Sequence, residues 1–145
     1  MFQHILIATD GSLLSQSALD KALDFAREAG AKVTVVTATE PFDVFAADST
    51  QLLEARASYE KHVKAEAAKH LEEAERKAKS LGVQCAVLQV ERQHAYRAII
   101  DTAKDRGCDL IAMASHGRRG ISALVLGSET TKVLTHSSIP VLVYR

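Results

Sequence analysis

The sequence predicts an α/β protein in which a parallel sheet is covered by helices on both faces. Short apolar runs rich in β-branched residues alternate along the chain with longer stretches of helical periodicity. Neighbouring parallel strands need long crossover connections, and the intervening helices supply them. The chain has 145 residues, of which 47% are hydrophobic and 25% charged, so it is long enough for a single domain, residues 1–145, with a substantial core.

Five segments have the length and composition of buried strands. They comprise residues 5–8, 33–37, 83–90, 110–114 and 139–143. Helical stretches separate them, so the predicted order of elements is βαβαβαβαβ. Periodicity alone does not set the order of the strands across the sheet.

Four stretches between these strands have helical periodicity. The first carries apolar residues at i, i+3, i+4 and i+7 and stops at Gly30, and the third has the same pattern and stops at Gly107. The second stretch, residues 51–81, is the longest. Its glutamates stand four residues ahead of lysines or arginines, which predicts a solvated face. His62 and His70 are expected on this face as well. The apolar positions of the other three are Leu19, Ala22, Leu23 and Ala26, then Tyr96, Ile99, Ile100 and Ala103, and finally Leu126, Thr130, Val133 and Leu134.

Composition excludes several classes of partner. The 18 basic and 18 acidic residues cancel, so no overall field attracts nucleic acid or an anionic membrane. The amino terminus lacks the features of a secretion signal and no apolar run reaches membrane-spanning length, so a cytoplasmic protein is expected. Cys85 and Cys108 are expected to be small hydrophobic residues rather than a disulfide, and the histidine spacings predict no metal site.

The segment after the fourth predicted strand carries the clearest functional pattern. Ala114-Ser115-His116-Gly117 is followed, after nine residues, by Gly127-Ser128 and a helix. Glycines let the backbone approach a ligand closely, and the start of a helix presents unpaired N–H groups to an anion. The pattern therefore predicts a phosphate cradle, although the glycines could also be ordinary turn residues, and Ser128 is expected to be the helix N-cap in either case.

Four segments of the chain resemble the universal stress protein family: residues 5–12, residues 109–121, the sequence Leu126-Gly127-Ser128 and residues 139–143. The resemblance spans the chain and implies a doubly wound, Rossmann-like sheet of order 3-2-1-4-5, similar to the adenine nucleotide alpha hydrolases. In such sheets ligands bind beyond the carboxyl ends of the strands where the order reverses, here between the first and fourth strands. Asp10 and Gly117 follow those two strands and are expected to meet there.

In nucleotide-binding members of this family the motif is Gly, two residues, Gly, nine residues, Gly, then Ser or Thr. This chain has Ala114 in place of the first glycine. The resemblance assigns Asp10 to the ribose and phosphate end of a nucleotide and Ala38, with Ala8 and Thr9, to the adenine ring. The full set of residues that it implies is Ala8, Thr9, Asp10, Ala38, Met113, Ala114, His116, Gly117, Arg118, Gly127, Ser128, Glu129 and Thr130.

The resemblance implies a homodimeric ATP-binding module in stress-response signalling rather than an enzyme, although slow hydrolysis remains open. Mg²⁺ would be carried on the phosphates, since no carboxylate cluster is evident to hold it. The dimer would form through the apolar last strand, at Ile139, Val141, Leu142 and Val143. The main alternative is a nucleotide-free stress-induced protein that acts by binding an unknown partner, and a phospho-receiver built on Asp10 ranks last. Residues 42–50 could cover the base or pack on the long helix.

Overall fold

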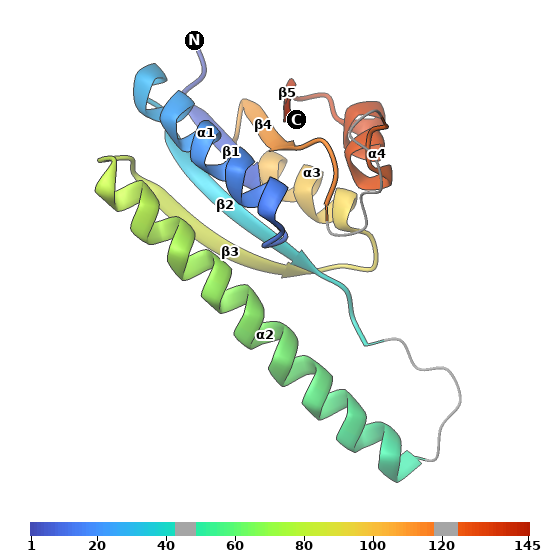
Figure 1. The fold of residues 1–145 in the computed structure, drawn as a ribbon. Helices are drawn as coiled ribbons and strands as arrows, with labels where there is room; N and C mark the ends of the chain where they lie inside the picture. The colour runs from blue at the N-terminus through green and yellow to red at the C-terminus, as the bar shows by residue number, and fades with distance from the viewer. Residues whose placement is uncertain (43–48, 118–124) are drawn as a thin grey trace.

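The computed structural model describes residues 1–42, 49–117 and 125–145. Five parallel strands form one sheet of order β3-β2-β1-β4-β5, which confirms the doubly wound architecture and the expected strand order (Figure 1). The strands are β1 (His4–Ala8), β2 (Lys32–Thr39), β3 (Cys85–Glu91), β4 (Leu110–Ala114) and β5 (Val141–Tyr144).

Two of the predicted strands begin later than expected. Val83 still belongs to the turn that ends the long helix, where its N–H donates to the carbonyl of Ala78. Ile139 donates its N–H to the hydroxyl of Ser137, and Pro140 has no N–H to donate, so pairing with β4 starts at Val141. Local hydrogen bonds therefore delay both strands by two residues relative to the apolar pattern.

The four helices cover the two faces in pairs, α1 with α2 and α3 with α4 (Figure 1). The amino-terminal part of α2 projects beyond the carboxyl end of β3, and there the Phe42 ring centroid lies 5.4 Å from that of Tyr59. Phe42 thus packs on the long helix, whereas residues 43–48 of the expected lid or packing segment lie outside the described residues. The helices are α1 (Leu13–Ala29), α2 (Ser49–Ser80), α3 (Ala95–Asp105) and α4 (Ser128–His136).

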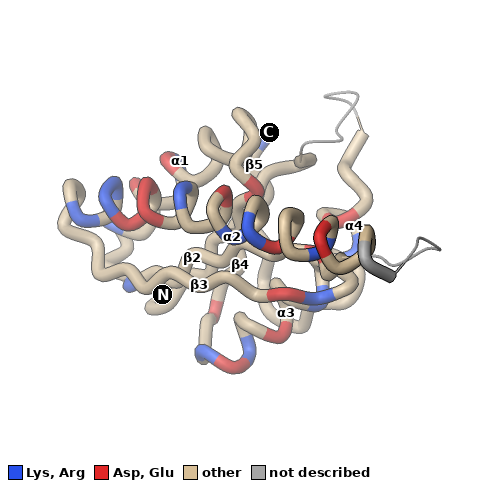
Figure 2. Tube along the Cα trace, turned by 90° about the horizontal axis from the view of Figure 1, so that it is seen from below, with Lys and Arg blue, Asp and Glu red and all other residues tan. Residues whose placement is uncertain are grey.

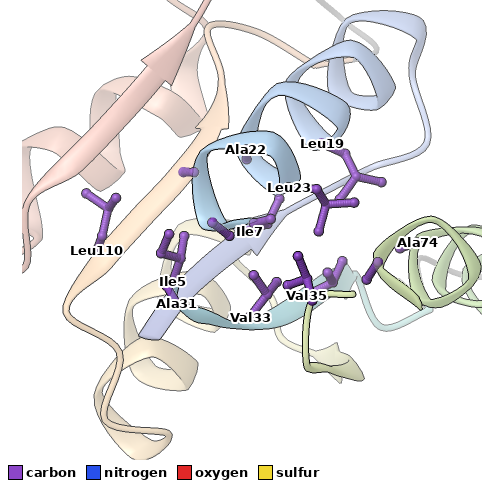
Figure 3. Close-up of a cluster of buried hydrophobic side chains, with 14 of the residues drawn as sticks. Ile5, Ile7, Leu19, Ala22, Leu23, Ala31, Val33, Val35, Ala74 and Leu110 are labelled. Carbon is purple, nitrogen blue, oxygen red and sulfur yellow. The ribbon is translucent and has the colours of Figure 1, made fainter. Parts of the chain in front are cut away.

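The sheet separates two hydrophobic clusters because alternate strand residues point to opposite faces. Ile5, Ile7, Val33 and Val35 pack against α1 and α2, and Figure 3 shows their side chains on the face of the sheet that α1 covers with Leu19 and Leu23. The opposite face packs against α3 and α4 and includes three fully buried residues of the central strands: Leu6, Val36 and Ile111.

The apolar pattern of the last helix was only half correct. Thr130 and Val133 are buried, as expected. Leu126, however, precedes α4 and is 38% exposed, and Leu134 is 42% exposed. A helix of nine residues buries a narrow stripe, so its outer leucine stays in solvent.

Lys and Arg residues are interspersed with Asp and Glu residues along α1 and α2 (Figure 2). Lys77 joins the two helices, because its Nζ lies 2.9 Å from Asp20 Oδ1 and 3.6 Å from Glu73 Oε1. The sequence places Glu73 four residues before Lys77 and Glu60 four residues before Lys64. The Glu73–Lys77 pair forms in the structure, whereas Glu60 bonds to Arg56. Exposed pairs of this kind contribute little to stability.

Asp109 aligns the amino-terminal ends of β1 and β4. Its carboxylate accepts backbone N–H bonds from Gln3 at 2.9 Å and His4 at 3.0 Å. Partial desolvation by itself raises the pKa of Asp109, but these hydrogen bonds outweigh it and hold the pKa below its usual value. The contact fixes the relative position of the two strands whose carboxyl ends flank the reversal point.

Cys85 and Cys108 are free thiols, and burial raises the pKa of each to about 11. Cys108 is buried, as expected for a small hydrophobic residue, whereas Cys85 on the edge strand β3 is half-buried. Within the described ranges, no helix combines the length and apolar character that crossing a bilayer requires.

We expect Leu23→Ala to lower the free energy of unfolding by about 3 kcal/mol, because Leu23 is fully buried between α1 and the sheet. The matched control is Leu13→Ala on the same helix, where the side chain is 85% exposed and little should change. Urea denaturation measures both variants. Equal destabilisation by the two substitutions would contradict this packing of α1.

Candidate functional site

A cleft of about 350 Å³ lies at the carboxyl ends of the central strands, where the strand order reverses. Every residue that the family resemblance implies lines this cleft, except Arg118, which lies outside the described residues. The lining residues expected from the sequence are Ala8, Thr9, Asp10, Ala38, Met113, Ala114, His116, Gly117, Gly127, Ser128, Glu129 and Thr130.

Five further residues line the cleft that the sequence did not predict. Val36 and Ile99 read as core residues, and both do contribute to the hydrophobic cluster beneath the cleft. Ala95 stands at the first position of α3, Glu40 directly follows β2, and Ser15 lies in the first turn of α1. For Ala95, Glu40 and Ser15, the position after a strand or at a helix start was the available signal, since the family motif itself covers only the segment between the end of β4 and the start of α4.

Hydrogen bonds hold the loop between β1 and α1 in one conformation. The buried hydroxyls of Thr9 and Ser15 share a bond of 2.8 Å, and Ser15 Oγ also accepts the Asp10 N–H at 3.0 Å. Asp10 Oδ1 accepts the N–H of Ser12 at 2.9 Å, and Ser12 caps α1 through the N–H of Ser15. Asp10 therefore stabilises the local turn before α1, and it also borders the cleft.

The two loops meet as expected. A Cβ atom placed on Gly117 would collide with the carboxylate of Asp10. Because Gly117 has no side chain, the carboxylate of Asp10 can approach the loop after β4.

Gly127 immediately precedes α4 and contacts the loop after β4 through its backbone. Its N–H donates to the carbonyl of Ser115 at 2.8 Å, and a Cβ at Gly127 would lie 3.0 Å from His116 Cα. Gly127, rather than Ser128, is the N-cap of α4, so the expectation for Ser128 was wrong. Because Ser128 is the first helical residue and is exposed, its hydroxyl is presented to the cleft without capping the helix.

Ala114 and Thr130 join the end of β4 to the first turn of α4. Thr130, which is 2% exposed, donates its hydroxyl to the carbonyl of Ala114 at 2.9 Å. Ala114 pairs with Tyr144 as the last residue of β4, in extended backbone that accepts any L residue. The methyl group at this departure from the family motif therefore causes no backbone strain.

Two histidines lie near the loops that form the cleft, His116 in the loop after β4 and His70 on α2. His116 Nδ1 lies 3.1 Å from Ser115 Oγ, a contact that orients the loop after β4. His70 was expected at the surface, but it comes from α2 to pack on Gly11, where a Cβ would collide with its ring. The side chain is only 15% exposed, because the long helix passes over the loop that carries Asp10.

The lining of the cleft combines apolar and polar groups. Its apolar side chains come from Ala8, Val36, Ala38, Ile99 and Met113. The first turn of α4 also borders the cleft, where its N–H groups have no partners inside the helix and the helix dipole makes this end of the helix partially positive. The described lining also contains three carboxylates, from Asp10, Glu40 and Glu129.

The fold is that of a doubly wound α/β protein with a cleft at the reversal point, the place where such sheets bind ligands. The model of the universal stress protein family matches residues 1–145. The universal stress protein YxiE of Bacillus subtilis is 33% identical, with both chains covered completely. The chain therefore belongs to the universal stress protein family.

Solved structures agree with this assignment. The protein MJ0577 of Methanocaldococcus jannaschii superposes with a TM-score of 0.83 at 25% identity, covering 99% of this chain and 95% of that one. A universal stress protein solved in complex with cAMP superposes with a TM-score of 0.73 at 26% identity, covering 99% and 97%.

We expect Thr130→Val to destabilise the protein by about 1–2 kcal/mol, because it keeps the side-chain shape but removes the buried hydrogen bond to Ala114. Thr131→Val is the control, since Thr131 is exposed and its hydroxyl donates to the Gly127 carbonyl one turn earlier on the same helix. Chemical denaturation compares the two. A larger loss for Thr131→Val would contradict the role of Thr130.

Proposed function

We propose that this universal stress protein is a homodimeric module that binds adenine nucleotides, with ATP as the expected ligand, in stress-response signalling in the cytoplasm. One observation carries the proposal: the loop after β1 and the start of α4 converge on a single cleft whose lining combines apolar side chains with the first-turn N–H groups of a helix. A nucleotide likewise combines a largely apolar base with anionic phosphates. The cAMP complex of a relative supports an adenine ligand.

The dimensions and chemistry of the cleft fit such a ligand. Its volume of about 350 Å³ is at the lower end of the range for small-molecule sites. Ala8 and Ala38 would lie against the base, while the first turn of α4 and the Ser128 hydroxyl would hold phosphate oxygens. Mg²⁺, where present, would arrive bound to the phosphates of ATP.

The proposal is a binding role without rapid turnover. His116, the histidine that borders the described cleft, is engaged by the hydroxyl of Ser115 in its own loop. An efficient hydrolase needs a base oriented toward an attacking water and cationic groups that stabilise the transferred phosphoryl group. Slow hydrolysis remains compatible with this role.

The alternative, a nucleotide-free protein that acts through a partner, has its own supporting observation. The described cleft is bordered by the carboxylates of Asp10, Glu40 and Glu129, which oppose a bound triphosphate. Native mass spectrometry of the purified protein distinguishes the two functions. Co-purified or added adenine nucleotide bound to the dimer supports the proposal, and a dimer that takes up no nucleotide supports the alternative.

We expect Ala114→Gly to improve ATP affinity by less than about tenfold, because Ala114 is in relaxed extended backbone and only its methyl group narrows the site. Isothermal titration calorimetry measures both proteins. A wild type that binds no nucleotide, together with strong binding by the variant, would contradict ATP sensing by the natural protein.

We expect Val143→Lys to convert the dimer into a monomer, because β5 is an edge strand whose outer side would pair with a second copy. Leu142 is less suitable for this test because it packs against the core beneath α1. Leu53→Lys on α2, where the side chain is 69% exposed, controls for the added charge. Multi-angle light scattering at micromolar concentration gives the mass, and a monomeric wild type would contradict the proposed assembly.

A further inference from the structure

Glu129 lies where the amino-terminal ends of α3 and α4 meet beside the cleft. It is the second residue of α4, and its Oε2 accepts a hydrogen bond of 2.9 Å from the backbone N–H of Tyr96, the second residue of α3. That N–H belongs to the first turn of α3, whose N–H groups have no partner inside the helix. Glu129 thus caps a helix other than its own.

The cap residue of α3 itself does not satisfy this turn. The N-cap is His94, which has extended backbone and makes no side-chain capping bond. Ser, Thr, Asp or Asn is the usual choice because a short polar side chain reaches the free N–H groups. The partially positive ends of both helices also favour a carboxylate between them. Glu129 therefore supplies an acceptor and a charge that the local sequence of α3 lacks.

Neighbouring side chains strengthen this junction. Lys132 Nζ lies 3.4 Å from Glu129 Oε1 and 5.6 Å from the centroid of the Tyr96 ring. The His136 ring lies 5.2 Å from the same ring. Residues 129, 132 and 136 follow helical spacing, so one face of α4 packs on the start of α3.

The junction lies beside one wall of the cleft. Ala95 and Ile99 of α3 line the cleft, and Tyr96 lies between them in sequence. Glu129 and Thr130 of α4 line it as well. We propose that Glu129 is a positioning residue that holds the first turn of α3 against α4 and thereby sets the width of the cleft for the base of the bound nucleotide. The identity of that ligand rests on the function proposed above.

The same contacts explain how an anion site tolerates this carboxylate. A free glutamate beside a phosphate would repel it. Glu129 is instead engaged by the Tyr96 N–H and by Lys132, which offsets its negative charge. The role assigned to Glu129 is therefore indirect and does not require contact with the ligand.

Hydrogen exchange of the ligand-free protein tests the cap directly. In Glu129→Ala the Tyr96 amide loses its acceptor, and we expect it to exchange at least about tenfold faster by NMR. In Glu129→Gln the amide oxygen can still accept this bond, so exchange should stay within about twofold of the wild type. Unchanged exchange in Glu129→Ala would overturn the proposal whether or not the protein binds nucleotide.

Affinity for adenosine and for AMP tests the effect on the cleft. We expect Glu129→Ala to weaken both by a similar factor of about three to ten, and Glu129→Gln to restore wild-type affinity. A charge effect on the phosphate would change AMP and leave adenosine unchanged, and direct contact through the carboxylate would make Gln as damaging as Ala. Either of these results would overturn the positioning role.

Glu73→Ala provides the matched control. Glu73 forms a 3.6 Å ion pair with Lys77 on α2, away from the cleft lining, so its removal should alter neither Tyr96 exchange nor affinity. A wild type that binds none of adenosine, AMP and ATP would refute the proposed function. Faster Tyr96 exchange in Glu129→Ala alone would then still establish the cap, so the two failures are distinguishable.

Discussion

The carboxyl ends of β1 and β4 lie side by side at the centre of the sheet, and the chain leaves them toward opposite faces. α1 follows β1 on one face, and α4 follows β4 on the other. Right-handed crossovers leave no element to cover the space between two such strands. The cleft is therefore a consequence of the strand order, and the remaining features of the site depend on this opening.

The polar groups around the opening are held mainly by one another. Ser15 joins the β1 loop to the start of α1, and Thr130 joins β4 to the start of α4. In the described part of the chain, every buried side-chain nitrogen or oxygen atom has a hydrogen-bond partner. A loop fixed in this way can present its backbone to a ligand without first becoming ordered, which lowers the entropic cost of binding.

Local chemistry made most of the architecture predictable. The apolar stripe of α1 and the stop at Gly30 identify the helix, because a residue in the left-handed region ends it: Gly30 has φ +68°. Residues of the family motif could be carried to the cleft because their spacing fixes which loop each occupies. The errors arose where a local hydrogen bond competes with the apolar pattern, as at Ile139, or where a helix is too short to bury all its leucines, as at Leu134.

The sequence alone determined the class of fold, the family and the loops that form the site. It could do so because the alternation of strands and helices, the motif glycines and the balanced charge are properties of the chain itself. Only the tertiary structure decided that Gly117 and Asp10 approach too closely for a side chain at position 117, that His70 packs on Gly11 and that Glu129 caps α3. Each of these contacts joins residues far apart in the chain. Periodicity and spacing describe neighbours within one element, whereas the approach of two elements depends on how all the side chains between them pack.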